Sequence, residues 1–194
     1  MTPRELLHVQ NNEFILANPE MKAKILAASR RNSRDKETNK YGSILCVGGE
    51  GKDGLQSNIF YRDQKSQWHI LSKMPVRRKN FAVCVVDEHL YVAGGIGIDG
   101  GTLSTVHRYA VKDDSWETLQ NMSKRRSCFS LLHLNGCIHA IGGYYDTANM
   151  TNTTELFDIR RQKWKKGSVL PNPRAQYGAI GMSRIIEVIM SNNN

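Results

Sequence analysis

Apolar residues in this chain occur in short runs, and several of the runs end at a pair of glycines. Two of the apolar runs, residues 81–86 and residues 90–93, flank a short turn at residues 87–88, and the second run ends at a glycine pair. Runs of this length, rich in β-branched and aromatic residues, are typical of buried strands. In a second copy the turn is Asn135-Gly136, which suits a two-residue hairpin. The pattern therefore predicts antiparallel hairpins.

These runs belong to a unit that recurs with a period of 48 residues, set by the spacing of the three tryptophans. An aromatic residue precedes each tryptophan by seven positions, an apolar residue follows it by six, and an arginine follows it by ten. Several features in one register indicate an internal repeat, and such a repeat decides the architecture. The arginines are Arg78, Arg126 and Arg174, and the predicted structural positions are Gly48, Gly49, Tyr61, Trp68, Gly94, Gly95, Tyr109, Trp116, Gly142, Gly143, Phe157 and Trp164.

Each unit is predicted to form a sheet of four strands. The first two form the hairpin that ends at the glycine pair, and a polar loop leads to a third strand with the aromatic residue and a fourth with the tryptophan. Paired glycines at a strand end indicate that a ring or a backbone packs where a Cβ would clash. We expect that ring to be the tryptophan of the same repeat, so that each sheet is held together by its own indole.

Two copies of the unit resemble kelch repeats, which are the roughly 50-residue blades of a β-propeller. The resemblance rests on residues 90–95 with Tyr109 and Trp116 and on residues 138–143 with Phe157 and Trp164, and it covers about residues 42–182. It implies an all-β fold: a partial kelch β-propeller of about three four-stranded blades in an incomplete ring. No apolar strand precedes residue 43, so the first blade is expected to lack its inner strand.

The first 28 residues differ from the repeats and are predicted to form a short α-helical N-terminal segment. Thr2 to Glu5 is a capping box, and Asn18-Pro19 is a second helix start. These helices resemble the end of a BACK domain, which in kelch-like proteins precedes the propeller. The expected organisation is BACK-like helices at 1–28, a linker at 29–41, a first repeat at 42–77, a second at 78–125, a third at 126–173 and the start of a truncated further repeat at 174–194. We therefore expect the chain to be a fragment or a short isoform of a kelch-like protein.

Composition narrows the classes of partner. The chain of 194 residues has a net charge of +9, but it contains no run of five basic residues and no aromatic signature of RNA binding, so no nucleic-acid partner is expected. No signal peptide or membrane-spanning run is visible, which favours a cytoplasmic protein, with a nuclear one as the alternative. The four cysteines show no C-x-x-C spacing and are expected to be reduced, buried thiols.

Motifs with catalytic or cofactor chemistry have structural interpretations here. Residues 95–100 match G-x-G-x-x-G, but a strand-like run follows instead of the helix that would hold a pyrophosphate. The six histidines show no metal-ligand spacing, and no nucleophile elbow or carboxylate pair is identifiable. The sequence therefore predicts a non-enzymatic protein with no catalytic, cofactor-binding or metal-binding residues.

With catalytic and cofactor motifs excluded, the sequence favours a protein-recognition scaffold in which rigid blades present variable loops. In the resembled family, residues after each glycine pair and residues before each inner strand line the substrate groove. Tyr144 and Tyr145 are the strongest candidate anchors, because tyrosines give rigid contact area, although loop tyrosines also cover their own blade. The candidate positions are Glu50, Lys52, Ile96, Ile98, Tyr144, Tyr145 and Asp146 in the first set and Asn80, Cys128 and Gln176 in the second.

The resemblance implies an adaptor that presents a protein substrate to a cullin-RING E3 ubiquitin ligase. In that family a BTB domain contacts the cullin, so cullin binding is expected only in a full-length form with that domain. The alternative is an actin-binding module of the cytoskeleton, because other kelch proteins bind actin. Strand edges at residues 43–49 and 176–182 are expected to be open, which predicts self-association between copies.

Overall fold

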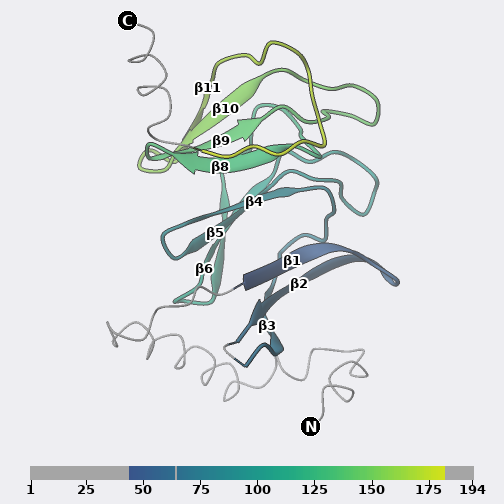
Figure 1. The fold of residues 1–194 in the computed structure, drawn as a ribbon, viewed down its shortest axis with the longest axis vertical. Helices are drawn as coiled ribbons and strands as arrows, with labels where there is room; N and C mark the ends of the chain where they lie inside the picture. Colours follow the sequence, from purple (N-terminus) through teal and green to yellow (C-terminus); the bar gives the residue numbers. More distant parts are fainter. Residues whose placement is uncertain (1–43, 64, 182–194) are drawn as a thin grey trace, which may run out of the picture. The chain divides into compact units, whose positions relative to one another are not determined.

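The computed structural model describes residues 44–63 and 65–181, and the predicted N-terminal helices and linker lie outside these residues. The described residues form strands in three sheets and no helix (Figure 1). They fall into two compact units, one of residues 44–47 and 58–74 and the other of residues 48–57 and 75–181. The prediction of an all-β fold is confirmed.

The first sheet has three strands in the order β1-β2-β3, which are β1 (Ile44–Gly51), β2 (Gly54–Arg62) and β3 (Trp68–Lys73). A register shift between Ile59 and Phe60 places Tyr61 opposite His69 and leaves Trp68 opposite Arg62. The Tyr61 ring stacks on His69 at 5.2 Å, and Trp68 is 46% exposed. The expectation that an indole holds this sheet together is therefore wrong, because the shift separates the tryptophan from its aromatic partner.

The second unit contains two four-stranded sheets, which we call blade 2 and blade 3 (Figure 1). Both follow the predicted chain path, with each strand hydrogen-bonded to the next. Tyr109 pairs with Trp116 in one sheet, and Phe157 pairs with Trp164 at the equivalent place in the other. Blade 2 consists of β4 (Ala82–Val86), β5 (His89–Ala93), β6 (Val106–Ala110) and β7 (Ser115–Leu119), and blade 3 of β8 (Ser130–Leu134), β9 (Cys137–Ile141), β10 (Thr154–Asp158) and β11 (Lys163–Lys166).

One apolar core joins blades 2 and 3. Leu90, Val92 and Ala93 of β5 are no more than 2% exposed, as their continuous apolar run predicts. Phe129, which directly precedes β8 of blade 3, belongs to the same buried cluster as Tyr91 and Ala93 of blade 2. The two blades are thus packed against each other, with the inner strands β4 and β8 in contact.

The glycine pairs mark the place where one blade meets the next. A Cβ on Gly94, whose φ is +61°, would lie 2.3 Å from the carbonyl oxygen of Arg126 and 2.8 Å from Cε1 of Phe129. A Cβ on Gly143 would lie 2.6 Å from Cβ of Phe129. The expectation that the tryptophan of the same repeat covers the glycines is wrong. Trp116 packs on Tyr109, at a centroid distance of 5.0 Å, and the pairing register places both toward the opposite end of the sheet.

The segment after blade 3 follows the same path as the entry into blade 3 but forms no strand. The backbone N–H of Gly143 donates to Arg174 O at 2.8 Å, and the Tyr177 hydroxyl donates to Ile141 O at 2.6 Å. Residues 176–181 were expected to show an inner-strand pattern and an open edge. They are not in a strand ladder, and residue 182 lies outside the described residues.

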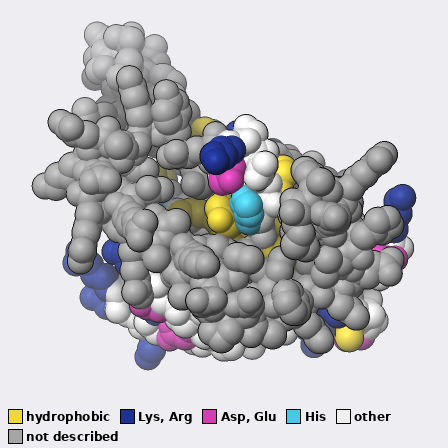
Figure 2. All heavy atoms as spheres, turned by 90° about the horizontal axis from the view of Figure 1, so that it is seen from below, with side chains coloured by type: hydrophobic (Ala, Val, Ile, Leu, Met, Phe, Trp, Pro, Cys, Tyr) yellow, Lys and Arg dark blue, Asp and Glu magenta, His cyan; other side chains and the backbone are white. Residues whose placement is uncertain are grey.

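Charges of both signs share the surface. Lys112 pairs with Glu88, and Arg161 pairs with Asp158 at 2.8 Å. Figure 2 likewise shows lysine, arginine, aspartate and glutamate side chains together on one face of the molecule. Within the ranges 44–63 and 65–181, no helix has the length and apolar character needed to cross a membrane.

Candidate functional site

Candidate residues of both sets lie close together in blades 2 and 3, where backbone bridges tie the loop after the glycine pair to the segment before the inner strand. In blade 2, Lys79 and Ile96 exchange N–H···O bonds of 3.0 and 2.7 Å. In blade 3, Ser127 and Tyr144 exchange bonds of 2.8 and 2.9 Å. We call the surface formed by these loops, residues 79–80, 96–104, 127–128 and 144–152, the loop face.

The positions before the inner strands form a chain of backbone hydrogen bonds from one repeat to the next. Cys128 N–H donates to Asn80 O at 2.8 Å, and Gln176 N–H donates to Cys128 O at 2.9 Å. All three residues have a left-handed backbone, with φ between 50° and 56°. Such a backbone costs about 1–2 kcal/mol in a residue that has a Cβ, so these hydrogen bonds hold the loop face in a strained geometry.

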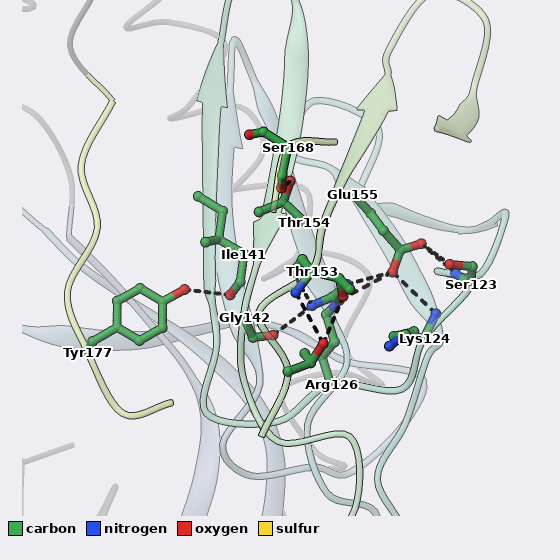
Figure 3. A network of polar contacts seen from close by, with 11 residues as sticks. Ser123, Lys124, Arg126, Ile141, Gly142, Thr153, Thr154, Glu155, Ser168 and Tyr177 are labelled. Carbon is green, nitrogen blue, oxygen red and sulfur yellow. Dashed lines mark hydrogen bonds and ion pairs between the residues drawn. The ribbon is translucent and has the colours of Figure 1, made fainter. Parts of the chain in front are cut away.

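A buried ion pair supports the loop face in blade 3 (Figure 3). The guanidinium of Arg126 is fully buried and donates to Gly142 O at 2.7 Å and to Thr153 O at 3.0 Å. It also contacts Glu155 Oε1 at 2.9 Å. One side chain thus links the glycine pair, the end of the following loop and strand β10.

Glu155 is held charged by its surroundings. Its carboxylate accepts hydrogen bonds from Ser123 Oγ at 2.6 Å, Ser123 N at 2.7 Å and Lys124 N at 3.2 Å, besides Arg126. Burial favours the neutral acid, but the hydrogen bonds from Ser123 and Arg126 outweigh it and lower the pKa of Glu155. Both oxygens of the Glu155 carboxylate therefore accept hydrogen bonds.

The equivalent arginine in blade 2 has no acidic partner among its hydrogen bonds. Arg78, which is 1% exposed, donates to Gly94 O at 2.9 Å and lies 3.0 Å from Nδ1 of His107, while its Nε has no hydrogen-bond partner within the described residues. Burial lowers the pKa of Arg78 to about 10. Burial and then the nearby Arg78 charge lower the pKa of His107 to about 4, so the imidazole is neutral at pH 7.

Sequence reasoning found these arginines but not their role. Their signal was the fixed spacing of ten residues after each tryptophan. The side chains that Arg78 and Arg126 meet, His107 and Glu155, occupy equivalent repeat positions of different chemistry. A search for an acidic residue at a fixed spacing from each arginine would therefore not have identified these partners, because only one of the two repeats has an acid at that position.

Three apolar side chains remain exposed on the loops of blades 2 and 3. Ile98 is 81% exposed, Tyr145 is 40% exposed and Met150 is 44% exposed. Tyr144 and Ile96 are half-buried in the bridges. The Tyr145 ring lies under the ammonium of Lys124, with 5.6 Å from Nζ to the ring centroid. Of the two candidate tyrosines, Tyr145 is the more accessible.

The charged candidates have structural partners or lie in a turn. Asp146 accepts hydrogen bonds from the side chain of Asn149 at 2.9 Å and from the backbone of Ala148 and Asn149, and these bonds lower the pKa of Asp146. Glu50 accepts two bonds of 3.0 and 2.9 Å from Lys79 Nζ. Lys52 is exposed in the turn between β1 and β2. Asp146 thus braces its own loop.

The described residues offer no arrangement typical of catalysis or metal binding. They contain no group of three His, Cys, Asp or Glu side chains that could hold a metal ion. Residues 97–101 form a turn closed by Gly97 N–H to Gly101 O at 3.0 Å, in place of a nucleotide-binding helix. All four cysteines are free, but none is fully buried as expected: Cys46 is exposed, and the other three are half-buried. Burial raises the pKa of Cys84 to about 12.

Comparisons with known proteins agree with the repeat and its fold. A family model described as the Kelch motif matches residues 77–123 and 125–168. Kelch-like protein 31 of Danio rerio is 32% identical over 110 residues, which are 49% of this chain and 17% of the relative. Kelch-like protein 31 of Homo sapiens is 40% identical over 55 residues, which are 27% of this chain and 9% of the relative. The chain spans less than a fifth of the length of these curated relatives.

A solved structure of YjhT matches with a TM-score of 0.60 and 14% identity, covering 70% of this chain and 51% of that one. At this identity the likeness concerns the fold alone.

Proposed function

Because this chain is a kelch-repeat protein, we propose that it binds a protein partner through the loop face of blades 2 and 3. Kelch blades are a rigid support for loops, and function on such a fold lies in the loops. The kelch-like relatives are consistent with a protein-interaction role. The candidate contact residues within the loop face are assigned to the partner contact as part of the proposal; they are Asn80, Ile96, Ile98, Cys128, Tyr144, Tyr145 and Asp146. Glu50, Lys52 and Gln176 lie outside the residues that define this face.

The observation that carries the proposal is that exposed apolar side chains lie on loops whose backbone is held by hydrogen bonds. Ile98, Tyr145 and Met150 are exposed on loops whose bases are bridged to Lys79 and Ser127. Ordered loops lose little conformational entropy on binding, and exposed apolar side chains supply the contact area. A loop face of this kind suits a protein surface better than a small polar ligand.

The test uses a photo-crosslinking residue placed at position 145 of the full chain. Partners that crosslink in cells are identified and purified, and their affinities for the wild type and for Ile98→Ser/Tyr145→Ala are measured. We expect the double variant to bind at least tenfold more weakly, about 1.4 kcal/mol, because it removes two contact side chains. The control is Val169→Ser, which changes an exposed valine beyond blade 3. Equal affinity of the double variant and the wild type would refute the proposal.

The finer proposal is that the bound protein is a substrate that a kelch-like adaptor presents to a cullin-RING E3 ubiquitin ligase. Its support is the resemblance to kelch-like proteins. In this proposal the substrate contacts the loop face, and the cullin contacts a BTB domain in a longer form of the protein. Actin binding is the competing function, and co-sedimentation with filaments would favour it.

We predict that residues 1–194 alone do not co-purify with a cullin scaffold, because no stretch of this sequence resembles a BTB domain. A pull-down with purified cullin measures this, with a kelch-like protein that carries a BTB domain as the positive control. Cullin retention by residues 1–194 would contradict the proposal that cullin binding requires a BTB domain. It would not contradict partner binding at the loop face.

A further inference from the structure

A groove separate from the loop contacts lies in blade 3, beside its outermost strand. It has a volume of about 380 Å³ and lies between the turn at Ser123–Lys124 and strands β10 and β11. Trp164, Lys165 and Lys166 of β11 line one side. Figure 3 shows Ser123 and Lys124 facing Glu155, which contributes to the groove from β10.

The groove has an excess of positive charge. Lys124, Lys165 and Lys166 are exposed, and they form no ion pair with any described residue. The single acid in the lining, Glu155, is already neutralised by Arg126 and saturated by the donors of Ser123 and Lys124. An incoming anion therefore meets Lys166, which stands opposite the compensated Glu155, and Lys124, whose ammonium lies over the Tyr145 ring. Lys165 alternates to the other face of β11 and adds positive charge at the strand edge.

The groove also has an aromatic wall. Trp164 is half-buried, its ring packs on Phe157 at a centroid distance of 5.2 Å, and its indole N–H donates to Gln120 O at 2.8 Å. The ring is thus fixed in position, which lowers the entropy lost when a ligand packs on it. A ligand that combines negative charge with an apolar group would use both features.

The repeat shows that the fold does not require these lysines. Blade 2 has Glu117 and Thr118 at the positions of Lys165 and Lys166, 48 residues earlier. There Glu117 pairs with Arg108 on the neighbouring strand, whereas in blade 3 Lys165 stands opposite Leu156. The same sheet is therefore built with a balanced pair in blade 2 and with unbalanced positive charge in blade 3.

We propose that this groove binds an extended acidic segment of a partner protein, with carboxylates at Lys124 and Lys166, a further acidic side chain reaching Lys165 across the edge of β11, and an apolar residue against Trp164. Charge complementarity selects the acidic side chains. The adjacent β11 is the last strand in the order of its sheet, but the backbone N–H of its Trp164 already donates to Gln120 Oε1 at 3.0 Å, so the segment is held by side-chain contacts in the groove and not by a ladder along β11. The groove is a second binding surface beside the loop face, and Lys124 borders both because its ammonium lies over the Tyr145 ring.

The test is fluorescence anisotropy with the full chain and a labelled peptide of six glutamates around a central leucine. We expect saturable binding that weakens at least tenfold in Lys165→Glu/Lys166→Thr, which carries the residues of blade 2 at these positions and so is compatible with the fold. The matched control, Arg62→Glu/Lys65→Thr, makes the same change in net charge at exposed positions outside blade 3 and should bind like the wild type. Thermal melts of both variants establish that they fold.

Three results would overturn the proposal: equal affinity of Lys165→Glu/Lys166→Thr and the wild type, equal weakening in the Arg62/Lys65 control, or equal binding of a peptide with glutamines in place of the glutamates. A 12-nucleotide uridylate RNA is titrated in parallel. If RNA binds more tightly than the acidic peptide and loses affinity in Lys165→Glu/Lys166→Thr, the groove is a nucleic-acid site instead. Since Ile98 and Tyr145 are unchanged, these outcomes do not bear on the loop face.

Discussion

At the scale of single residues, the two buried arginines show how one repeat position tolerates different chemistry. Arg126 has a carboxylate partner in Glu155, and Arg78 has the neutral imidazole of His107. Both guanidinium groups also donate to the carbonyl of a glycine pair. The carbonyl contacts are therefore the constant part of the arrangement, and the second partner is the variable part.

Glu155→Gln should lower the free energy of unfolding by about 3 kcal/mol, because it leaves the charge of Arg126 buried without a counter-ion. This is near the low end for a broken buried pair, since the carbonyls of Gly142 and Thr153 remain as acceptors. Urea unfolding measures the change. Glu117→Gln is the control, because its pair with Arg108 is exposed and should contribute no more than about 1 kcal/mol. Similar losses in the two variants would contradict this account.

His107 should make the protein less stable as the pH falls below 6.5. Its pKa is 6.5 when unperturbed and about 4 in the folded protein, so between these values the unfolded chain binds a proton that the folded chain does not. Stability is complete above pH 6.5 and is lost progressively toward pH 4. The expected loss from this residue is about 1–2 kcal/mol between pH 7 and pH 5.

The measurement is urea unfolding of the wild type and His107→Asn at both pH values, because the difference cancels the carboxylates that titrate in both proteins. His107→Asn should show the smaller loss on acidification. His133→Asn, which changes an exposed histidine of β8, should keep the slope of the wild type. If the wild type and His107→Asn have equal slopes, the imidazole is not buried neutral beside Arg78.

At the scale of secondary-structure elements, the glycine pair explains how one blade approaches the next. Gly94 leaves room for the Arg126 carbonyl and the Phe129 ring, and Phe129 also fills the space at Gly143. Phe129 therefore connects the ends of β5 and β9 to the entry of β8. Trp116 and Trp164, by contrast, pack on the third strand of their own sheets.

Gly94→Ala should destabilise the protein by about 2–5 kcal/mol, combining about 1–2 for the left-handed backbone with about 1–3 for overpacking against Arg126 and Phe129. Chemical unfolding measures the loss. Gly100→Ala is matched in backbone, with a φ of +78°, but its Cβ would meet no atom within 4 Å. It should cost only the backbone strain, so equal losses would show that the close approach contributes nothing.

At the scale of the whole molecule, the edges of the sheets differ in how well they are protected against pairing. The β11 edge of blade 3 carries Lys163, Lys165 and Lys166, and lysines on an edge oppose association. The β1 edge carries Ile44, which is 47% exposed, and within the described residues β1 pairs only with β2. Self-association through strand edges remains a prediction, now assigned to β1.

Ile44→Lys should shift the protein toward monomer in light scattering over a concentration series, because a charged edge does not pair with a second copy. Ile98→Lys adds the same charge on the loop face and should leave the association unchanged. If the wild type is monomeric throughout the series, or if both variants act equally, the β1 edge is not the contact.

The sequence by itself determined the strands of blades 2 and 3, their hairpin order and the 48-residue repeat, but the inner strand that it predicted at residues 176–182 is not formed by residues 176–181. These features depend on local alternation, turn residues and spacing, which are visible along the chain. It also located the positions of the loop face, whose role in binding stays a proposal. Phe157 and Trp164 were correctly predicted on neighbouring strands, because a hairpin fixes their register.

Only the tertiary structure decided what fills the space at the glycines, what the buried arginines contact and which tryptophan is exposed. Phe129 reaches Gly94 from the following repeat, and Glu155 reaches Arg126 across 29 residues. Trp68 is exposed because of a register shift that its unchanged spacing from Tyr61 does not reveal. Contacts between repeats depend on how sheets pack, and a one-residue slip moves a side chain to the other face of its sheet.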